Sequence, residues 1–326
     1  MRAILKAACV VGLVSLAVAP GVWAGEYHVY ACRTPLGESA PVDGWSGSVA
    51  PGGAYDDYAT DTCAAGGALT AALGEETAHV ADVDEATWAF SVPAGERMVG
   101  ATLWRAGDAD GGGATNATYE LWLAGPSDSS IFDDCVYEFG CPSGVGDPAQ
   151  SLSEANRVVV PSANLGAHLY LNAACGGESK FECPSGRGDA NGFAAVVYLY
   201  AADIVLEQAE GPSGREVSGP LATEGTVQGT SDVTFNATDP GAGVWEVVFS
   251  VDGKLVQSTV PDEDGGRCRD VGQSTDGLPA FLYLQPCPLS EGVDVGFDTA
   301  AVSPSGDRRR SAGGPLGAHG RAWLDG

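Results

Sequence analysis

Three stretches in the first half of the chain alternate apolar and polar residues. They span residues 88–92, 99–104 and 119–123. A period of two is typical of β-strands with one buried face, because successive side chains point to opposite sides of the sheet. Residues 93–95, Pro-Ala-Gly, supply a turn after the first stretch, and the glycine-rich run 107–113 separates the second from the third. The pattern predicts an antiparallel three-stranded meander inside a β-sandwich.

Further short runs on both sides of this meander have the same character, and loops rich in Gly and Pro separate them. These runs are residues 26–32, 157–160, 167–172 and 193–200. Residues 64–72 fit either a short helix or a weakly marked strand. Many short strands with Gly and Pro turns favour an all-β fold. We therefore predict a jelly-roll-like β-sandwich domain over residues 25–206.

A second domain is predicted after the polar segment 207–222, which loses apolar periodicity and contains Gly and Pro, as linkers do. Beyond this linker, residues 244–251 form a strand pattern that ends at a hairpin turn signal, Asp252-Gly253. The region resembles bacterial immunoglobulin-like domains, and the residues that carry the resemblance are Asp239, Gly241, Gly243, Val244, Val251, Asp252 and Gly253. The resemblance implies a smaller immunoglobulin-like β-sandwich over residues 223–302.

The last part of the chain, residues 303–326, has three consecutive arginines and no strand periodicity. An immunoglobulin-like domain would place its last strands near here. The sequence therefore predicts an irregular basic tail and an incomplete second sandwich with an unpaired edge. A truncated or out-of-frame end and a disordered basic tail are both open explanations.

Across the whole chain after residue 24, the arrangement resembles secreted actinobacterial proteins with a concanavalin A-like or jelly-roll domain followed by an immunoglobulin-like domain. The phrases that carry this resemblance are DGW at 43–45, GAYDDYATDTC at 53–63, LWRAGDADGG at 103–112 and VVYLYAADIVLEQ at 196–208. The resemblance implies an extracellular location and β architecture, and it brings no known reaction with it.

The first 24 residues have the pattern of a secretory signal peptide. Arg2 and Lys6 precede the apolar run 7–19, and residues 22–24, Val-Trp-Ala, fit a cleavage site. Nothing later reaches about 18 uninterrupted apolar residues, so we expect export without a membrane span. The formal net charge of -27 makes nucleic acid an unexpected partner, because an acidic surface repels phosphates.

Nine cysteines leave eight once Cys9 is removed with the signal peptide, and an even number in an exported chain indicates disulfides. Proximity in the sequence suggests the pairs Cys32–Cys63, Cys135–Cys141, Cys175–Cys183 and Cys268–Cys287. The four histidines lie far apart, and no close cysteine pairs accompany them, so no zinc site is predicted.

Two tryptophans of the predicted meander are candidates for ligand binding. Trp104 and Trp122 fall on the face opposite the apolar leucines of strands that we expect to be neighbours, with Glu120 between them. Such rings could stack on a sugar while the carboxylate binds hydroxyls. The alternative is that a second sheet or a loop buries them. Tyr55 and Tyr58 are weaker candidates.

Asp108 and Asp110 place two carboxylates on a glycine-rich loop. Calcium takes six to eight oxygen ligands, so these two could form part of a site together with Asp56, Asp57 or Asp61. The full spacing of an EF-hand is missing, and a solvated acidic turn is the other interpretation. No cofactor is expected apart from this calcium.

No catalytic signature is present: paired carboxylates in an E-x-D-x-E array, G-x-S-x-G and H-E-x-x-H are all missing. The sequence therefore predicts a secreted, non-catalytic extracellular recognition or adhesion protein. Its expected partner is an extracellular glycan or another cell-surface component. The alternatives left open are a secreted polysaccharide hydrolase or lyase and a structural component of the cell envelope.

Overall fold

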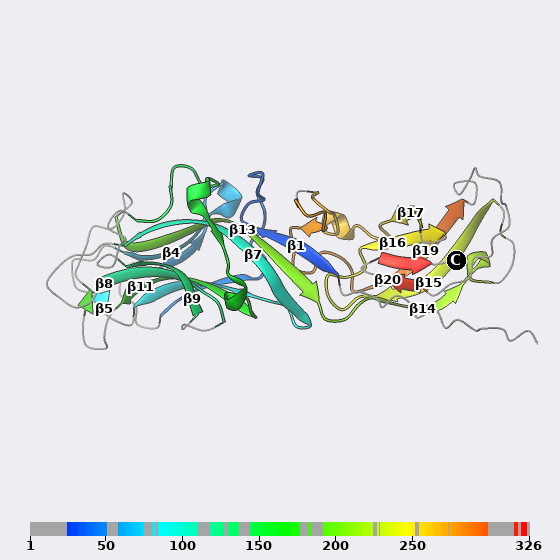
Figure 1. Ribbon diagram of the computed structural model, residues 1–326, viewed down its shortest axis with the longest axis horizontal. Coiled ribbons are helices and arrows are strands. Elements are labelled where there is room, and N and C mark those ends of the chain that lie inside the picture. Colours follow the sequence, from blue (N-terminus) through cyan, green and yellow to red (C-terminus); the bar gives the residue numbers. More distant parts are fainter. Residues whose placement is uncertain are drawn as a thin grey trace, which may run out of the picture.

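The computed structural model describes most of the chain from Gly25 onward. The described residues are 25–50, 58–74, 80–81, 84–109, 118–126, 130–136, 144–176, 182–183, 192–223, 227, 229–251, 254–272, 274–298, 316–318 and 321–324. The predicted signal peptide lies outside them. Within them the fold is all-β with no α-helix, and the predicted all-β sandwich is confirmed. Figure 1 shows two groups of sheets arranged end to end.

The first sandwich has two main layers. Its larger sheet has seven strands, which are β1 (Glu26–Ala31), β3 (Tyr58–Asp61), β4 (Leu69–Gly74), β7 (Glu96–Ala109), β10 (Arg157–Val159), β13 (Phe193–Gln208) and β18 (Ala280–Phe281). The facing sheet has the order β2 (Trp45–Val49), β6 (Glu85–Ser91), β11 (His168–Gly176), β8 (Thr118–Ala124) and β9 (Ile131–Val136). A separate small sheet pairs β5 (Val80–Ala81) with β12 (Glu182–Cys183).

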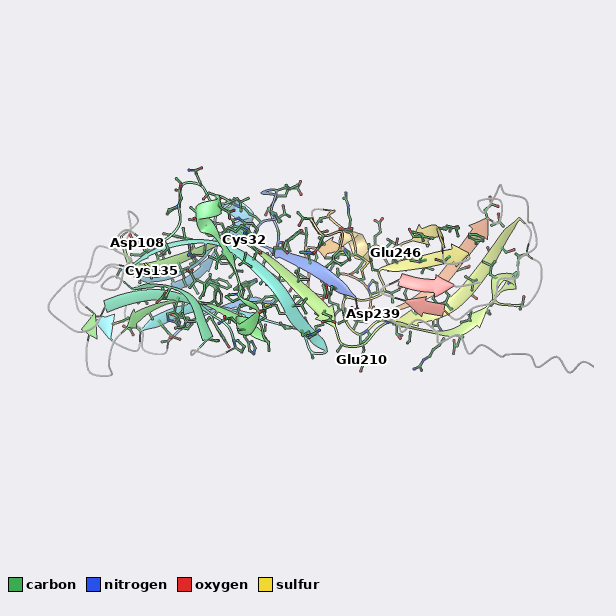
Figure 2. The ribbon with its side chains drawn as sticks, in the orientation of Figure 1. Cys32, Asp108, Cys135, Glu210, Asp239 and Glu246 are labelled. Carbon is green, nitrogen blue, oxygen red and sulfur yellow. A yellow bond between two sulfur atoms is a disulfide. The ribbon has the colours of Figure 1, made fainter. Side chains whose placement is uncertain are left out.

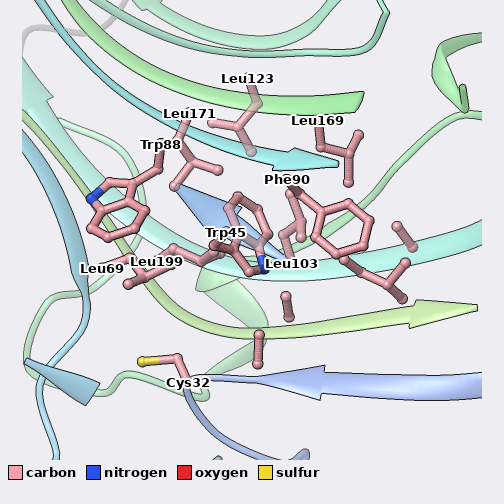
Figure 3. Close-up of a cluster of buried hydrophobic side chains, with 14 of the residues drawn as sticks. Cys32, Trp45, Leu69, Trp88, Phe90, Leu103, Leu123, Leu169, Leu171 and Leu199 are labelled. Carbon is pink, nitrogen blue, oxygen red and sulfur yellow. The ribbon is translucent and has the colours of Figure 1, made fainter. Parts of the chain in front are cut away.

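The core of this sandwich lies between the two main layers. Apolar side chains that alternate along the strands point inward from both sheets, and Figure 3 shows Trp88, Phe90 and Leu171 from one layer facing Leu103 and Leu199 from the other. The last four of these side chains are at most 1% exposed. The period-two pattern therefore identified core positions correctly.

The predicted meander, in contrast, is wrong. β7 does not pair with β6 or β8: it joins the seven-stranded sheet, whereas β6 and β8 both pair with β11 in the facing sheet. The chain crosses between layers at each turn. Alternation within a strand shows which side chains face the core, but it is the same for a strand in either layer. Because β6, β7 and β8 are not paired with one another in sequence order, the Gly- and Pro-containing sequences between them do not mark hairpins.

Residues 64–72, which fit either a helix or a strand, are divided between a 3₁₀ turn at Cys63–Ala65 and strand β4. Every residue of β4 is buried. Because both faces of β4 are covered, apolar side chains such as Ala71 and Ala72 lie on both of them. The strand therefore shows little alternation of apolar and polar residues. Burial on both faces explains why the sequence marks this strand so weakly.

A buried ion pair ties the two layers together. Arg105 on β7 donates from Nε and Nη2 to the two carboxylate oxygens of Asp133 on β9, at 2.5 and 2.8 Å. The side chains are 9% and 19% exposed. Because β7 and β9 belong to different sheets, this two-pronged contact bridges the sandwich near one edge.

The second sandwich contains two further sheets. One has the order β14 (Ser213–Ser218), β15 (Thr230–Thr238) and β19 (Ser290–Asp298). The other has the order β17 (Lys254–Thr259), β16 (Glu246–Val251), β21 (Arg321–Leu324) and β20 (Leu316–Ala318). Their facing apolar residues, among them Val233, Phe235, Phe249 and Phe297, form a second core. That β16 and β17 pair across the Asp252-Gly253 turn signal confirms the predicted hairpin.

Two expectations about this region are wrong. The predicted linker 207–222 contains a strand, β14, that pairs with β15 at the edge of a sheet. The tail 303–326 was expected to lack strands, yet β21 pairs in parallel with β16 and β20 pairs with β21. A polar edge strand such as β14, exposed at every position, has no apolar periodicity to reveal it.

A segment from the second half of the chain packs on the first sandwich. We call residues 260–289, between β17 and β19, the docking segment; residue 273 lies outside the described part. Its strand β18 pairs in parallel with β1 and so forms one edge of the seven-stranded sheet. Phe281 enters the first core and contacts Tyr27 edge to face. The two sandwiches are thus joined by a returning segment as well as by the chain that follows β13.

Two of the predicted disulfides, Cys32–Cys63 and Cys268–Cys287, are confirmed. The second of these closes the docking segment on itself. Cys135 and Cys175 are also disulfide-bonded. The predicted pairs Cys135–Cys141 and Cys175–Cys183 include side chains outside the described part, so these pairings stay predictions. Among the described residues, no helix has the length and apolar character needed to span a membrane.

Candidate functional site

An open pocket of about 500 Å³ lies on the outer face of the seven-stranded sheet, away from the core. Strands β1, β7, β10 and β13 form its base, and the docking segment and the loop after β10 contribute to its walls. Its polar lining residues are His28, Thr102, Arg157, Ser162, Asp203 and Thr275, and its largest apolar side chain is Trp104. Small-molecule sites are concave and combine apolar or aromatic side chains with a few hydrogen-bonding groups, and this pocket contains both kinds of group.

The strand register explains why these side chains share one face. Thr102 lies directly opposite Asp203 on β13 and opposite Val159 on β10. Two residues further along β7, Trp104 lies opposite Arg157. Because residues i and i+2 of a strand point the same way, Thr102 and Trp104 project from the outer face while Leu103 between them enters the core.

Trp104 is half-buried. It packs against the outer-face cluster of Ala68, Ala106 and Tyr200 while it lines the pocket. Packing of this kind fixes the ring in one position. A fixed ring loses little conformational entropy when a ligand stacks on it.

His28 at the pocket's edge is held between two carboxylates. Its Nδ1 lies 2.6 Å from Oδ1 of Asp203, and its Nε2 lies 3.1 Å from Oδ2 of Asp276 in the docking segment. Burial by itself lowers the pKa of His28, but the bonds and charges of the two aspartates outweigh it and raise that pKa. Burial and the nearby carboxylates also raise the pKa of Tyr30, the next outward-facing residue of β1. The imidazole is therefore poised to carry a positive charge.

The structure separates the two predicted tryptophans. Trp104 lies on β7 and Trp122 on β8, in opposite layers of the sandwich. Since each points away from the shared core, the two rings cannot contact one ligand, and the prediction of a joint site is wrong. Trp122 lies opposite Asp134 on β9 and Asn172 on β11. It does not line the pocket at Trp104.

Of the other predicted ligand-binding residues, Tyr58 is described in full and does not line this pocket. Tyr58 lies on β3 and contacts Phe193 edge to face, with ring centroids 5.0 Å apart. Glu120 lies on β8, beside Trp122, and its side chain is outside the described part, as is the whole of Tyr55. Among the predicted residues whose side chains the structure describes, Trp104 alone lines this pocket.

The predicted calcium residues fall near the end of β7. Asp108 accepts a hydrogen bond from the backbone N–H of Ala109 at 2.9 Å, and Figure 2 shows it toward the end of the first sandwich that lies away from the second. Asp110 lies outside the described residues. In the part of the chain that the structure describes, no three His, Cys, Asp or Glu side chains gather as a metal site. The calcium site remains a prediction.

Sequence reasoning missed most of this pocket. The sequence does not mark His28 as a site residue, because no other histidine is near it in the chain. Its partners Asp203 and Asp276 lie 175 and 248 positions away. One signal was present: Asp203 interrupts the apolar run of β13, and a charged residue in such a run needs a partner. No protein-family model, curated protein or solved structure matches this chain.

Proposed function

We propose that this protein is a secreted, non-catalytic recognition or adhesion protein that binds an extracellular glycan in the pocket at Trp104. The observation that carries the proposal is the pairing of a fixed indole with hydroxyl, carboxylate and guanidinium groups on one concave face. An indole offers an apolar surface for the C–H face of a sugar ring. The surrounding polar groups match its hydroxyls.

The charges around the pocket favour a neutral glycan over a charged one. Arg157 contributes a positive charge, Asp203 a negative one, and His28 is engaged by carboxylates on both sides. The chain as a whole carries a net charge of -27, which would repel polyanionic ligands at long range. A carboxylate such as Asp203 accepts hydrogen bonds from hydroxyl groups, while Arg157 donates them.

Export is supported by the two confirmed disulfides, since such bonds persist in oxidising compartments. In this proposal the second sandwich acts as a spacer. None of the described residues in its strands lines the pocket, and Figure 1 shows it extending away from the first sandwich. The docking segment is the exception, because it joins the two parts and supplies Thr275.

A glycan array tests the proposal, because the chain offers a matched pair of variants. Trp104→Ala should weaken binding of any glycan hit by roughly 30-fold, as loss of an aromatic anchor costs about 2 kcal/mol or more. Trp122→Ala, the same substitution in the facing sheet, should leave binding unchanged. Trp104→Phe should recover part of the affinity. Thermal melting of each variant separates lost binding from lost folding.

Other outcomes of this array would favour the other functions. Hits that survive Trp104→Ala but vanish in Trp122→Ala would place the glycan on the facing sheet and contradict the proposed pocket. Cleavage of a bound oligosaccharide would support a secreted hydrolase or lyase. An array without hits, repeated with calcium, would leave a structural role in the cell envelope as the better explanation.

A further inference from the structure

The outer face of β1 is covered by the docking segment. The alternating pattern of this strand predicts one exposed side, yet from Tyr27 to Ala31 every residue is buried. Tyr30 on the outward side packs with Ala40 and with Ala280 of the docking segment, together with Val271 and Leu282 from the same segment. The segment thus closes a small apolar cluster on a surface that would otherwise face water.

The first polar contact at the segment is complete only with a charged imidazole. Both ring nitrogens of His28 lie within hydrogen-bonding distance of carboxylate oxygens, Nδ1 of Asp203 on β13 and Nε2 of Asp276 in the segment. An ionised carboxylate only accepts hydrogen bonds, and a neutral imidazole has a single N–H. Both bonds can therefore form together only when His28 is protonated.

The second polar contact follows the same logic. The hydroxyl of Tyr27 lies 2.8 Å from Oε2 of Glu96, at the start of β7, and 2.9 Å from the carbonyl oxygen of Leu284 in the segment. A tyrosine hydroxyl has one proton to donate. Both contacts are satisfied when a protonated Glu96 donates to Tyr27 and Tyr27 donates to Leu284. Ionised Glu96 competes with Leu284 for the tyrosine proton.

The groups around these two contacts reinforce their dependence on protons. Burial raises the pKa of Glu96 to about 7, and the charge of Asp239 adds to the rise although the Tyr27 bond opposes it. Figure 2 shows Asp239 where the two sandwiches meet. Arg97, the next residue of β7, is already paired with Glu207 on the neighbouring strand β13.

The groups facing His28 are equally few. Asp203 faces it from β13, Asp276 from the docking segment and Tyr30 from β1, while Asp270 of the segment acts on Tyr30. Burial raises the pKa of Asp276, but its bonds from the Leu278 backbone and from His28 outweigh that effect and lower it. Asp276 therefore stays ionised when His28 is charged.

We propose that the docking segment is a pH-released clasp, held on β1 and β7 while His28 and Glu96 carry protons and freed when both lose them. The segment supplies Thr275 to the pocket and lies against His28 at its edge. Release removes this wall, so the clasp regulates the ligand site; only this last step rests on the proposed function.

Both groups act in the same direction with pH. Each holds its proton more tightly in the folded chain, so its contribution to docking is complete at low pH and is lost as the pH rises. For Glu96 the loss extends from 4.5 to about 7. For His28 the contribution is complete below 6.5 and disappears as the pH passes through the raised pKa.

Hydrogen exchange of the ligand-free full chain tests the clasp directly. After correction for the intrinsic pH dependence of exchange, amides of residues 278–285 should lose about tenfold or more in protection between about pH 5 and about pH 8, since one pKa unit corresponds to a tenfold change. Strands β6 and β11 serve as an internal reference and should keep their protection. Equal behaviour of the segment and this reference would overturn the proposal.

Matched variants assign the effect to the two groups. Glu96→Gln stays neutral and can still donate to Tyr27, so it should retain more protection at high pH than the natural chain. His28→Gln should have weak protection already at low pH. His168→Gln makes the same change on β11, where the ring contacts Ser91 instead, and should behave like the natural chain. An unchanged pH profile in both Glu96→Gln and His28→Gln would contradict the proposal.

A separate arm keeps this inference distinct from the proposed function. Binding of an array hit is measured at both pH values for the natural chain and for Glu96→Gln. Weaker binding at high pH that Glu96→Gln partly restores supports gating of the pocket. Segment release without any change in binding would refute the gating step and leave the exchange result intact. An array without hits bears on the proposed function alone.

Discussion

Replacing Asp133 with alanine should lower the free energy of unfolding by about 3 kcal/mol, because it leaves the guanidinium of Arg105 buried without a counter-charge. The Arg105 side chain is only 9% exposed, so water cannot replace the lost carboxylate fully. The pair also joins β7 and β9 from opposite sheets, and its loss loosens the contact between the layers. Urea unfolding followed by tryptophan fluorescence measures the change.

Asp134 provides the control for this experiment. It is the next residue on β9, points to the exposed face and lies opposite Trp122. Asp134→Ala should change stability by no more than about 0.5 kcal/mol. A double variant, Arg105→Leu with Asp133→Leu, should recover most of the loss, since apolar residues can replace a buried ion pair. If Asp133→Ala cost no more than Asp134→Ala, the ion pair would contribute nothing to the sandwich.

Replacing Gly243 with alanine should destabilise the protein by about 2–5 kcal/mol, the sum of a left-handed backbone penalty of about 1–2 and an overlap penalty of about 1–3 kcal/mol. Gly243 has φ +87°, and a Cβ here would overlap the carbonyl group of Cys287 and the carbonyl oxygen of Pro288. On either side of it, Val244 donates to Pro288 and Cys287 donates to Ala242. The clash would therefore separate the end of the docking segment from the chain before β16.

Gly95 separates the two causes of this loss. It has the same φ of +87°, but no atom lies within 4 Å of the position of its Cβ. Gly95→Ala should therefore show the backbone penalty alone, about 1–2 kcal/mol. Equal losses for Gly95→Ala and Gly243→Ala, measured by the same urea unfolding, would mean that close approach to Cys287 is unimportant.

The sequence pattern of the second sandwich predicted some of its features and missed others. The hairpin at Asp252-Gly253 is where the sequence pattern predicted it. The returning docking segment between β17 and β19 could not be anticipated from that pattern. Its described residues between 261 and 279 contain no strand, and its backbone pairing with β1 depends on the two-residue strand β18.

The candidate site shows the same limit. Trp104 could be selected because it is a large aromatic residue on the outward side of a strand whose apolar residues alternate with it. The predicted joint site of Trp104 and Trp122 is wrong, because the alternation along a strand does not show which layer that strand joins. The residues from other strands that join Trp104 in the pocket, Arg157 on β10 and Asp203 on β13, follow from the pairing of β7 with these two strands.

The sequence by itself determined the all-β character, the inward-facing positions of the strands and two of the disulfides, because these depend on local periodicity and on cysteine content. Only the tertiary structure decided which layer each strand entered and which side of β1 was covered. It also brought His28 to Asp276 across 248 positions. Such choices depend on how whole faces pack against one another, and a residue's neighbours along the chain carry no information about that packing.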